Sequence, residues 1–107
     1  ARWGRIRTEL ACAAALLDAA GRSLEASESD PAAPARGAGG RGQELSTEVR
    51  AGVARATRAV LEECRTLAGP AGVAFDAELA QALADLELYV AQQNADADQG
   101  YLGALPR

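Results

Sequence analysis

Few side chains in this chain could carry chemistry, and histidine is absent from all 107 residues. Without an imidazole, the usual Ser-His and Cys-His nucleophile pairs cannot form. The two cysteines, Cys12 and Cys64, lie far apart in the sequence and offer no CxxC metal spacing. Asp96 and Asp98 belong to a polar ADAD run, which is typical of solvated charges near a helix end. The sequence therefore predicts no catalytic residue and no metal ligand.

Charge and hydrophobicity exclude further classes of protein. All 11 basic residues are arginine, 15 residues are acidic, and the net charge is −4. Because a nucleic-acid-binding protein needs a basic face to neutralise phosphates, we expect no nucleic-acid partner. No apolar run approaches the roughly 20 residues that span a bilayer, so we expect no membrane association.

The expected compartment follows from the cysteines and from the absence of a visible secretory signal. We expect a cytoplasmic protein in which Cys12 and Cys64 are free thiols. The alternative is a disulfide between them, which two facing helices could allow.

The fold class follows from length and periodicity. A chain of 107 residues is one domain, 1–107, with room for a single modest core. Apolar positions recur every three or four residues in three stretches, which predicts helices over about 4–26, 45–68 and 77–94. The expected fold is all-α, a three-helix antiparallel up-down-up bundle.

The first predicted helix carries an unbroken apolar stripe with the 3–4 spacing of a bundle seam. Its members are Trp3, Ile6, Leu10, Ala13, Leu17, Ala20 and Leu24. We expect Trp3 in the core or at its edge, with a partner contact as the alternative. Residues 27–43 follow, with two prolines, four glycines and no large apolar side chain, and they predict a flexible loop.

The second and third helices are separated by the stretch LAGPAGVAFDAE at positions 67–78. Gly69 suits the left-handed backbone that often follows a helix C-terminus, and Pro70 cannot continue the helix. Asp76 is a good N-cap for the third helix, and Phe75 before it is placed to pack onto the first turn. The sequence thus predicts a turn between two antiparallel helices.

The remaining signals concern a cap, a charged face and the tail. Ser46 or Thr47 is the expected cap of the second helix. Arg55 and Arg58 on that helix predict a solvated face, with an anion contact as the alternative.

Residues 100–107 predict a tail from which three apolar side chains fold back: Tyr101, Leu102 and Leu105. Because three alanine-rich helices leave apolar surface uncovered, we expect packing against another copy or another chain.

The order of these features resembles the C-terminal helical domain of the flavin-dependent acyl-CoA dehydrogenase family. The resemblance is carried by the AGPAG turn, the Phe75–Asp76 pair, the helix ELAQALADLELYVAQ and the segment ADADQGYLG. It covers Leu45 to Leu105, and Trp3 to Ala26 more loosely, which is one domain of a family that normally has three. It implies a C-terminal piece, split subunit or degenerate paralogue of such a flavoprotein, supplying the oligomer core.

In that family a glycine-rich turn lets the backbone approach the flavin dinucleotide of a neighbouring subunit. Carried over by position, the resemblance implies cofactor-binding roles for Thr66, Gly69, Pro70 and Gly72, with FAD held only together with a partner chain. Thr66 stands where the family often has a glutamine. Pro70 replaces a glycine and lacks an N–H that could donate to the cofactor.

The same resemblance places the family's Arg-Asp pair at Ala84 and Asp85, and its catalytic glutamate at Gln93. An amide cannot act as a general base, so general-base catalysis from this position is not available, although flavin chemistry is not excluded. Because the family's sheet domain and N-terminal helical domain are missing, the resemblance implies that the chain is not a complete enzyme alone. As part of one, it would belong to an FAD-dependent acyl-CoA dehydrogenase-like oxidoreductase, with a flavoprotein subunit or further copies of itself as partners. The alternative is a noncatalytic helical protein–protein interaction module that acts through its exposed apolar stripe.

Overall fold

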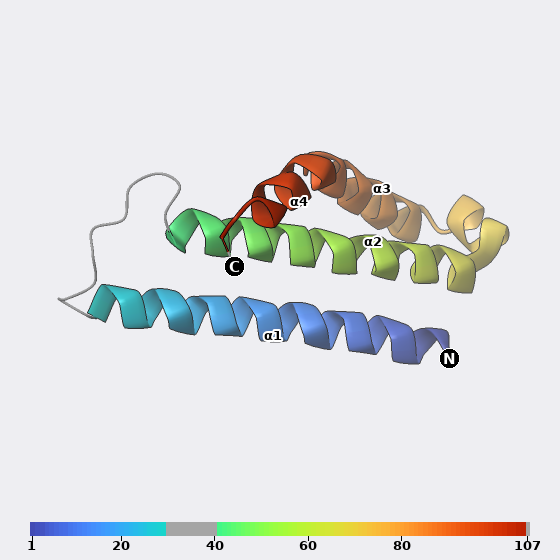
Figure 1. Ribbon diagram of the computed structural model, residues 1–107. Coiled ribbons are helices and arrows are strands. Elements are labelled where there is room, and N and C mark those ends of the chain that lie inside the picture. Colours follow the sequence, from blue (N-terminus) through green and yellow to red (C-terminus); the bar gives the residue numbers. More distant parts are fainter. Residues whose placement is uncertain (30–40, 107) are drawn as a thin grey trace.

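The protein consists of four helices in a computed structural model that describes residues 1–29 and 41–106 (Figure 1). α1 spans Arg2–Ser29, α2 spans Arg41–Phe75, α3 spans Ala77–Ala91 and α4 spans Ala95–Gly103. No residue in the described ranges belongs to a strand, so the all-α prediction is confirmed. The predicted number of helices is wrong by one, because α4 forms where a tail was expected.

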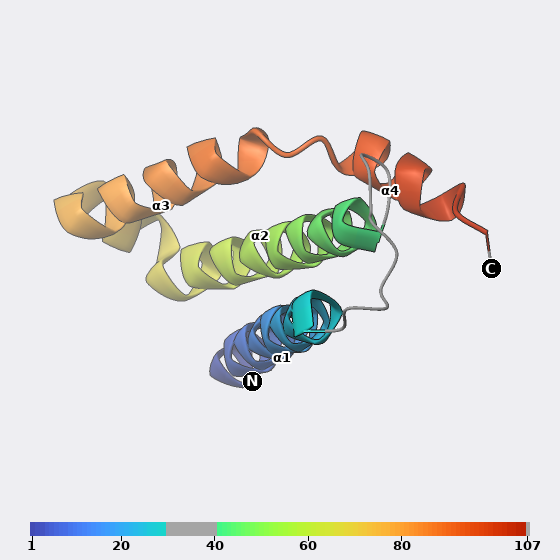
Figure 2. The same cartoon turned by 90° about the vertical axis from the view of Figure 1, so that its left-hand side faces the viewer.

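α2 is the central helix, and within the part of the chain that the structure describes the other three helices pack only against it. α1 runs antiparallel along one side of α2, while α3 and α4 lie along the other (Figures 1 and 2). Among the described residues, no Cα of α1 comes within 8 Å of a Cα of α3. The expected bundle is therefore wrong in its packing. The first three helices do alternate in direction, but α2 lies between α1 and α3 (Figure 2). The molecule measures 57 × 24 × 24 Å along its principal axes.

The core between these helices is thin, as the alanine content leads one to expect. Its buried apolar side chains are Ile6, Ala20, Leu45, Ala51, Ala54, Ala56, Leu61, Leu83 and Val90. Small residues bring the helix axes close together. At Gly52 a Cβ atom would lie 2.3 Å from Cδ2 of Leu16, so the glycine is what admits this leucine of α1 against α2.

The apolar stripe of α1 is split between core and solvent. Ile6 and Ala20 are buried against α2. The large members Trp3, Leu10, Leu17 and Leu24 are between 44% and 72% exposed. The prediction that Trp3 lies in the core or at its edge is wrong, because α1 has a neighbour on one side only and packs on α2 through the other edge of the stripe.

α2 is broken near its end, at Gly69, which has φ 68° and ψ 174°. This left-handed φ is the conformation expected there, so the predicted stop is confirmed. Pro70 then opens a short helical segment that continues to Phe75, where a simple turn was expected.

α3 begins at the predicted cap. The N–H of Leu79 donates to Oδ1 of Asp76 at 3.0 Å. Phe75 is 90% exposed, so its expected packing onto the first turn is wrong. The short helical segment from Pro70 thus ends at Phe75 with the aromatic ring in solvent.

The start of α2 also differs from the prediction. The helix begins at Arg41, so neither Ser46 nor Thr47 caps it; Thr47 is buried and its hydroxyl donates to the Gln43 carbonyl at 2.8 Å. Of the loop predicted over 27–43, residues 27–29 end α1 and 41–43 begin α2. The prediction for 30–40 lies outside the described residues.

α4 begins at a cap that apolar periodicity does not reveal. Oδ1 of Asn94 accepts the N–H of Ala97 at 3.0 Å, and Asp96 and Asp98 place negative charge in the first turn, where the helix dipole favours it. The tail predicted over 100–107 is thus helical up to Gly103. The three side chains expected to fold back are half-buried: Tyr101, Leu102 and Leu105.

Candidate partner-binding groove

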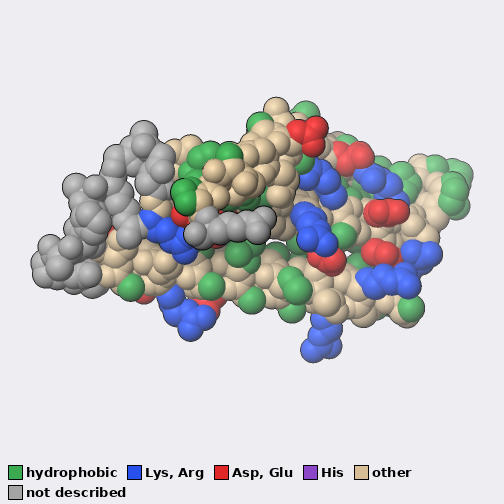
Figure 3. Space-filling model, viewed as in Figure 1, with side chains coloured by type: hydrophobic (Ala, Val, Ile, Leu, Met, Phe, Trp, Pro, Cys, Tyr) green, Lys and Arg blue, Asp and Glu red, His purple; other side chains and the backbone are tan. Residues whose placement is uncertain are grey.

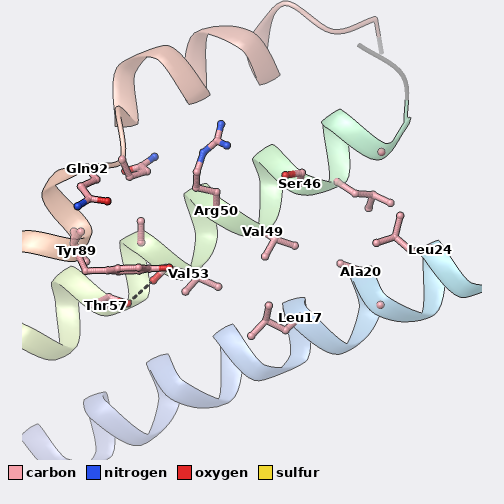
Figure 4. A pocket seen from close by; sticks show the side chains of 16 residues that line it. Leu17, Ala20, Leu24, Ser46, Val49, Arg50, Val53, Thr57, Tyr89 and Gln92 are labelled. Carbon is pink, nitrogen blue, oxygen red and sulfur yellow. Dashed lines mark hydrogen bonds between the residues drawn. The ribbon is translucent and has the colours of Figure 1, made fainter. Parts of the chain in front are cut away.

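A groove of about 800 Å³ runs along α2 between α1 and the end of α3 (Figure 4). We call it the α2 groove. Its floor comes from α2, and its walls come from α1 and from the end of α3 with the two residues that follow it, Gln92 and Gln93. Its larger apolar lining residues are Leu17, Leu24, Leu45, Val49, Val53, Tyr89 and Val90, and its polar ones include Arg50, Gln92 and Gln93.

The sequence of α2 explains why the floor is apolar. α1 and α3 cover its two flanks, which leaves two further faces. The 3–4 spacing places one set of residues on the groove face: Ser46, Val49, Val53, Thr57, Val60, Cys64 and Leu67. The opposite face carries Glu44, Glu48, Arg55 and Glu62. Figure 3 shows one face of the molecule, on which acidic and basic side chains are interspersed. Among the described residues, no helix covers the apolar face.

Tyr89 supplies the largest side chain of the groove. It is 71% exposed and reaches from α3 toward Val53 and Thr57 on the floor (Figure 4). The Thr57 hydroxyl donates to the Val53 carbonyl at 2.8 Å, so its proton is used inside α2. The floor therefore offers a partner mainly van der Waals contact, with an aromatic ring at one wall.

A polar cluster fixes the wall formed by the end of α3. Arg50 donates from Nε and Nη2 to the two carboxylate oxygens of Asp98, at 2.9 and 2.6 Å, and Nε2 of Gln93 donates to the same carboxylate at 2.7 Å. Arg58 donates to Oε1 of Gln93 at 2.8 Å and to the Val90 carbonyl at 3.3 Å. Two arginines of α2 thus hold the junction of α3 and α4.

This cluster shifts the acidity of Asp98. Hydrogen bonds from Arg50 and Gln93 lower the pKa of the carboxyl from 3.8 to about 2, and the hydrogen bond to Asp98 raises the pKa of Arg50. Asp98 is only 6% exposed, so the prediction that it is solvated is wrong, whereas Asp96 is exposed as expected. The ionised carboxylate, with its hydrogen bonds from Arg50 and Gln93, holds α4 against α2.

The four positions assigned by the family resemblance lie together, but away from the groove. Thr66, Gly69, Pro70 and Gly72 are at the break of α2, and none of them lines the α2 groove. The Thr66 hydroxyl donates to the Glu62 carbonyl at 3.0 Å. A Cβ atom at Gly69 would meet no atom within 4 Å, so the backbone there is open to an approaching group.

The other residues discussed from the sequence occupy separate places. Gln93 is held in the polar cluster. Asp85 is exposed and accepts a hydrogen bond from Gln81 of its own helix at 2.7 Å. Cys12 is exposed and Cys64 half-buried, and both are free thiols, as expected.

Two further findings concern the described residues as a whole. Residues 1–29 and 41–106 contain no group of three or more Cys, Asp or Glu side chains placed to hold a metal ion. None of their helices has both the length and the apolar character that crossing a bilayer requires. The chain matches no protein-family model, no curated protein and no solved structure.

Proposed function

We propose that this chain is a noncatalytic helical interaction module whose α2 groove binds an amphipathic helix. The observation that supports this most is the uncovered apolar face of α2. A long helix with valines at successive turns is normally buried on that side. Here two helices flank the face and leave it open, which is the geometry of a layer that lacks its covering helix.

A helix suits the groove better than an extended peptide. The groove is bounded on both sides by helices and has no sheet edge among the described residues that could pair with a strand. A docked helix would place apolar side chains at spacings of three, four and seven residues onto Val49, Val53 and Leu17. Each large apolar side chain that becomes fully buried contributes about 1.5–3 kcal/mol.

Specificity in this proposal comes from shape and from Tyr89. Arg50 and Gln93 are committed to Asp98, so they offer the partner little charge. Aromatic side chains in apolar pockets are the usual centres of binding energy in such interfaces. We therefore expect Tyr89 to contribute more to binding than any other residue of the wall.

The test uses a synthetic amphipathic peptide of about three heptads with leucine at the a and d positions. We expect calorimetry to show binding to the dilute chain, and Val53→Glu to abolish it while circular dichroism keeps its helical signal. Arg55→Glu, on the opposite face of the same helix, is the matched control and should bind as the unchanged chain does. A chain that associates neither with the peptide nor with itself would contradict the proposal.

A second candidate function is a C-terminal piece of an acyl-CoA dehydrogenase-like flavoprotein. The observation that favours it is Gly69, whose left-handed φ and open surroundings make a tight turn that another group can approach. Thr66, Gly69, Pro70 and Gly72 would form one wall of an FAD site completed by a partner chain, with the flavin supplying the redox chemistry. Purification from the native host should then yield a yellow complex with a flavoprotein subunit. A colourless preparation without such a subunit would exclude this candidate.

A further inference from the structure

We propose that a second copy of this chain covers the α2 groove, with its α1 lying antiparallel to α1 of the first copy and its α2 facing the groove. This inference rests on the interaction function proposed above and names the partner. It is supported by three independent features of α1: the spacing of its exposed apolar residues, the alternation of large and small side chains, and the distribution of charge along the helix.

The exposed residues of α1 form a complete helix-pairing seam. Trp3, Leu10, Leu17 and Leu24 are seven residues apart, which is the heptad spacing of a coiled coil. Four residues after each of them stand Arg7, Ala14, Gly21 and Glu28, all exposed. These eight residues, which we call the α1 seam, alternate in steps of four and three. The seam extends over about 37 Å at 1.5 Å per residue.

Large and small side chains alternate in the middle of the seam, and an antiparallel partner would match them. When Leu17 lies opposite Ala14 of the second copy, Leu10 lies opposite Gly21, and the same contacts recur on the other side of the two-fold axis. Leu10 and Leu17 thus face residues with little or no side chain, while Leu24 lies opposite Arg7 and Trp3 lies opposite Glu28. Such complementarity lets two helices approach closely without a clash or a void.

Charge along α1 favours the same direction of pairing. Arg5 and Arg7 lie near its start, and Glu25 and Glu28 lie near its end. Arg22 and Asp18 neutralise each other in an ion pair at 2.6 Å, whereas Arg7, Glu25 and Glu28 form no ion pair among the described residues. An antiparallel partner brings opposite charges together at both ends, and a parallel partner would bring like charges together.

The α1 seam is continuous with the α2 groove. Leu17, Gly21 and Leu24 belong to both. Because Leu16 of α1 abuts Gly52, the midpoint of the seam lies level with the turn of α2 that contains Val49 and Val53. One two-fold axis therefore passes over the centre of the seam and the centre of the floor. The result is an isologous dimer, in which the same patch serves both copies.

The first experiment measures the association of the unchanged chain by sedimentation equilibrium. We expect a dimer, and we expect Leu17→Glu to make it a monomer that keeps its helical circular dichroism. Leu88→Glu is the matched control, because Leu88 is an exposed leucine of α3 outside the groove. It should leave the dimer intact.

The second experiment tests the direction of pairing by charge exchange at low ionic strength. Arg7→Glu and Glu28→Arg should each raise the dimer dissociation constant by about tenfold or more, because each places like charges together at both ends of the seam. The double variant restores opposite charges and should return the constant close to that of the unchanged chain. Failure of the double variant to recover would overturn the antiparallel pairing.

The outcomes separate this inference from the function on which it rests. A chain that stays monomeric at high concentration but binds the amphipathic peptide overturns self-pairing and supports the interaction module. A chain that does neither overturns both. A dimer that is insensitive to Leu17→Glu overturns the assignment of the α1 seam.

Discussion

Asp98 holds two elements of the fold in place through a single carboxylate. It accepts hydrogen bonds from Arg50 of α2 and from Gln93, which follows α3. These bonds position α4 and one wall of the α2 groove. The sequence suggests a solvated acid because its neighbours are polar. Its main partner is 48 residues away, and no local pattern indicates that pairing.

The lowered pKa of Asp98 predicts an acid-sensitive contribution to stability. Since the folded-state pKa, about 2, lies below the ordinary 3.8, the contribution is fully present above pH 3.8 and is lost as the pH falls toward 2. Asp98→Asn should lower the melting temperature near neutral pH and flatten the loss of stability between pH 4 and 2. The control is Asp96→Asn, on an exposed acid of the same helix turn. If both variants lost the same free energy of unfolding between pH 4 and 2, this role for Asp98 would be contradicted.

Gly52 illustrates a constraint set by space alone. An added Cβ atom would lie 2.3 Å from Leu16, so Gly52→Val should destabilise the fold by about 1–3 kcal/mol through overpacking. Gly100 of α4 has no atom within 4 Å of an added Cβ, and Gly100→Ala should stabilise by about 0.5–1 kcal/mol through helix propensity. Urea unfolding measures both. A Gly52→Val variant as stable as the unchanged chain would show that the Leu16 side chain can rotate away from this position.

At the scale of the elements, the sequence predicts three of the four helices. It does not predict how the helices pack against one another. Apolar spacing locates α1, α2 and α3 because each has a continuous stripe. α4 has no such stripe, and Asn94 is its main signal. The stripes do not say which helix covers which face, and the expected bundle is wrong for that reason. The floor of the groove is visible in the sequence as a row of valines, but its openness is a property of the arrangement.

The break in α2 gives a prediction for a single element. Gly69 has φ 68° and ψ 174°, a region that is essentially restricted to glycine and costs other residues about 1–3 kcal/mol, so Gly69→Ala should destabilise the junction of α2 and α3 by that amount. Gly69→Asn should cost about as much, because the left-handed helical region that asparagine tolerates has a ψ of about +47°. Denaturant unfolding measures both variants. A Gly69→Ala variant as stable as the unchanged chain would contradict a positive φ at this position.

At the scale of the whole molecule, the row of helices limits how much apolar surface the chain can bury. No large side chain in the described ranges is less than 2% exposed, and leucines, a tryptophan and a tyrosine remain in solvent. Small domains are marginally stable because their cores are small, and this one also leaves one side of its central helix uncovered. Covering that side with a second copy would add the missing layer.

The arrangement in which α1, α3 and α4 each pack on α2 also has a consequence for cooperativity. Within residues 1–29 and 41–106, no Cα of α1 lies within 8 Å of a Cα of α3 or α4, so we expect α1 and the α3–α4 pair to detach from α2 as separate units. Native-state hydrogen exchange should give these two units different opening free energies. The amides of α2 should exchange last, because they are released only when both units have opened.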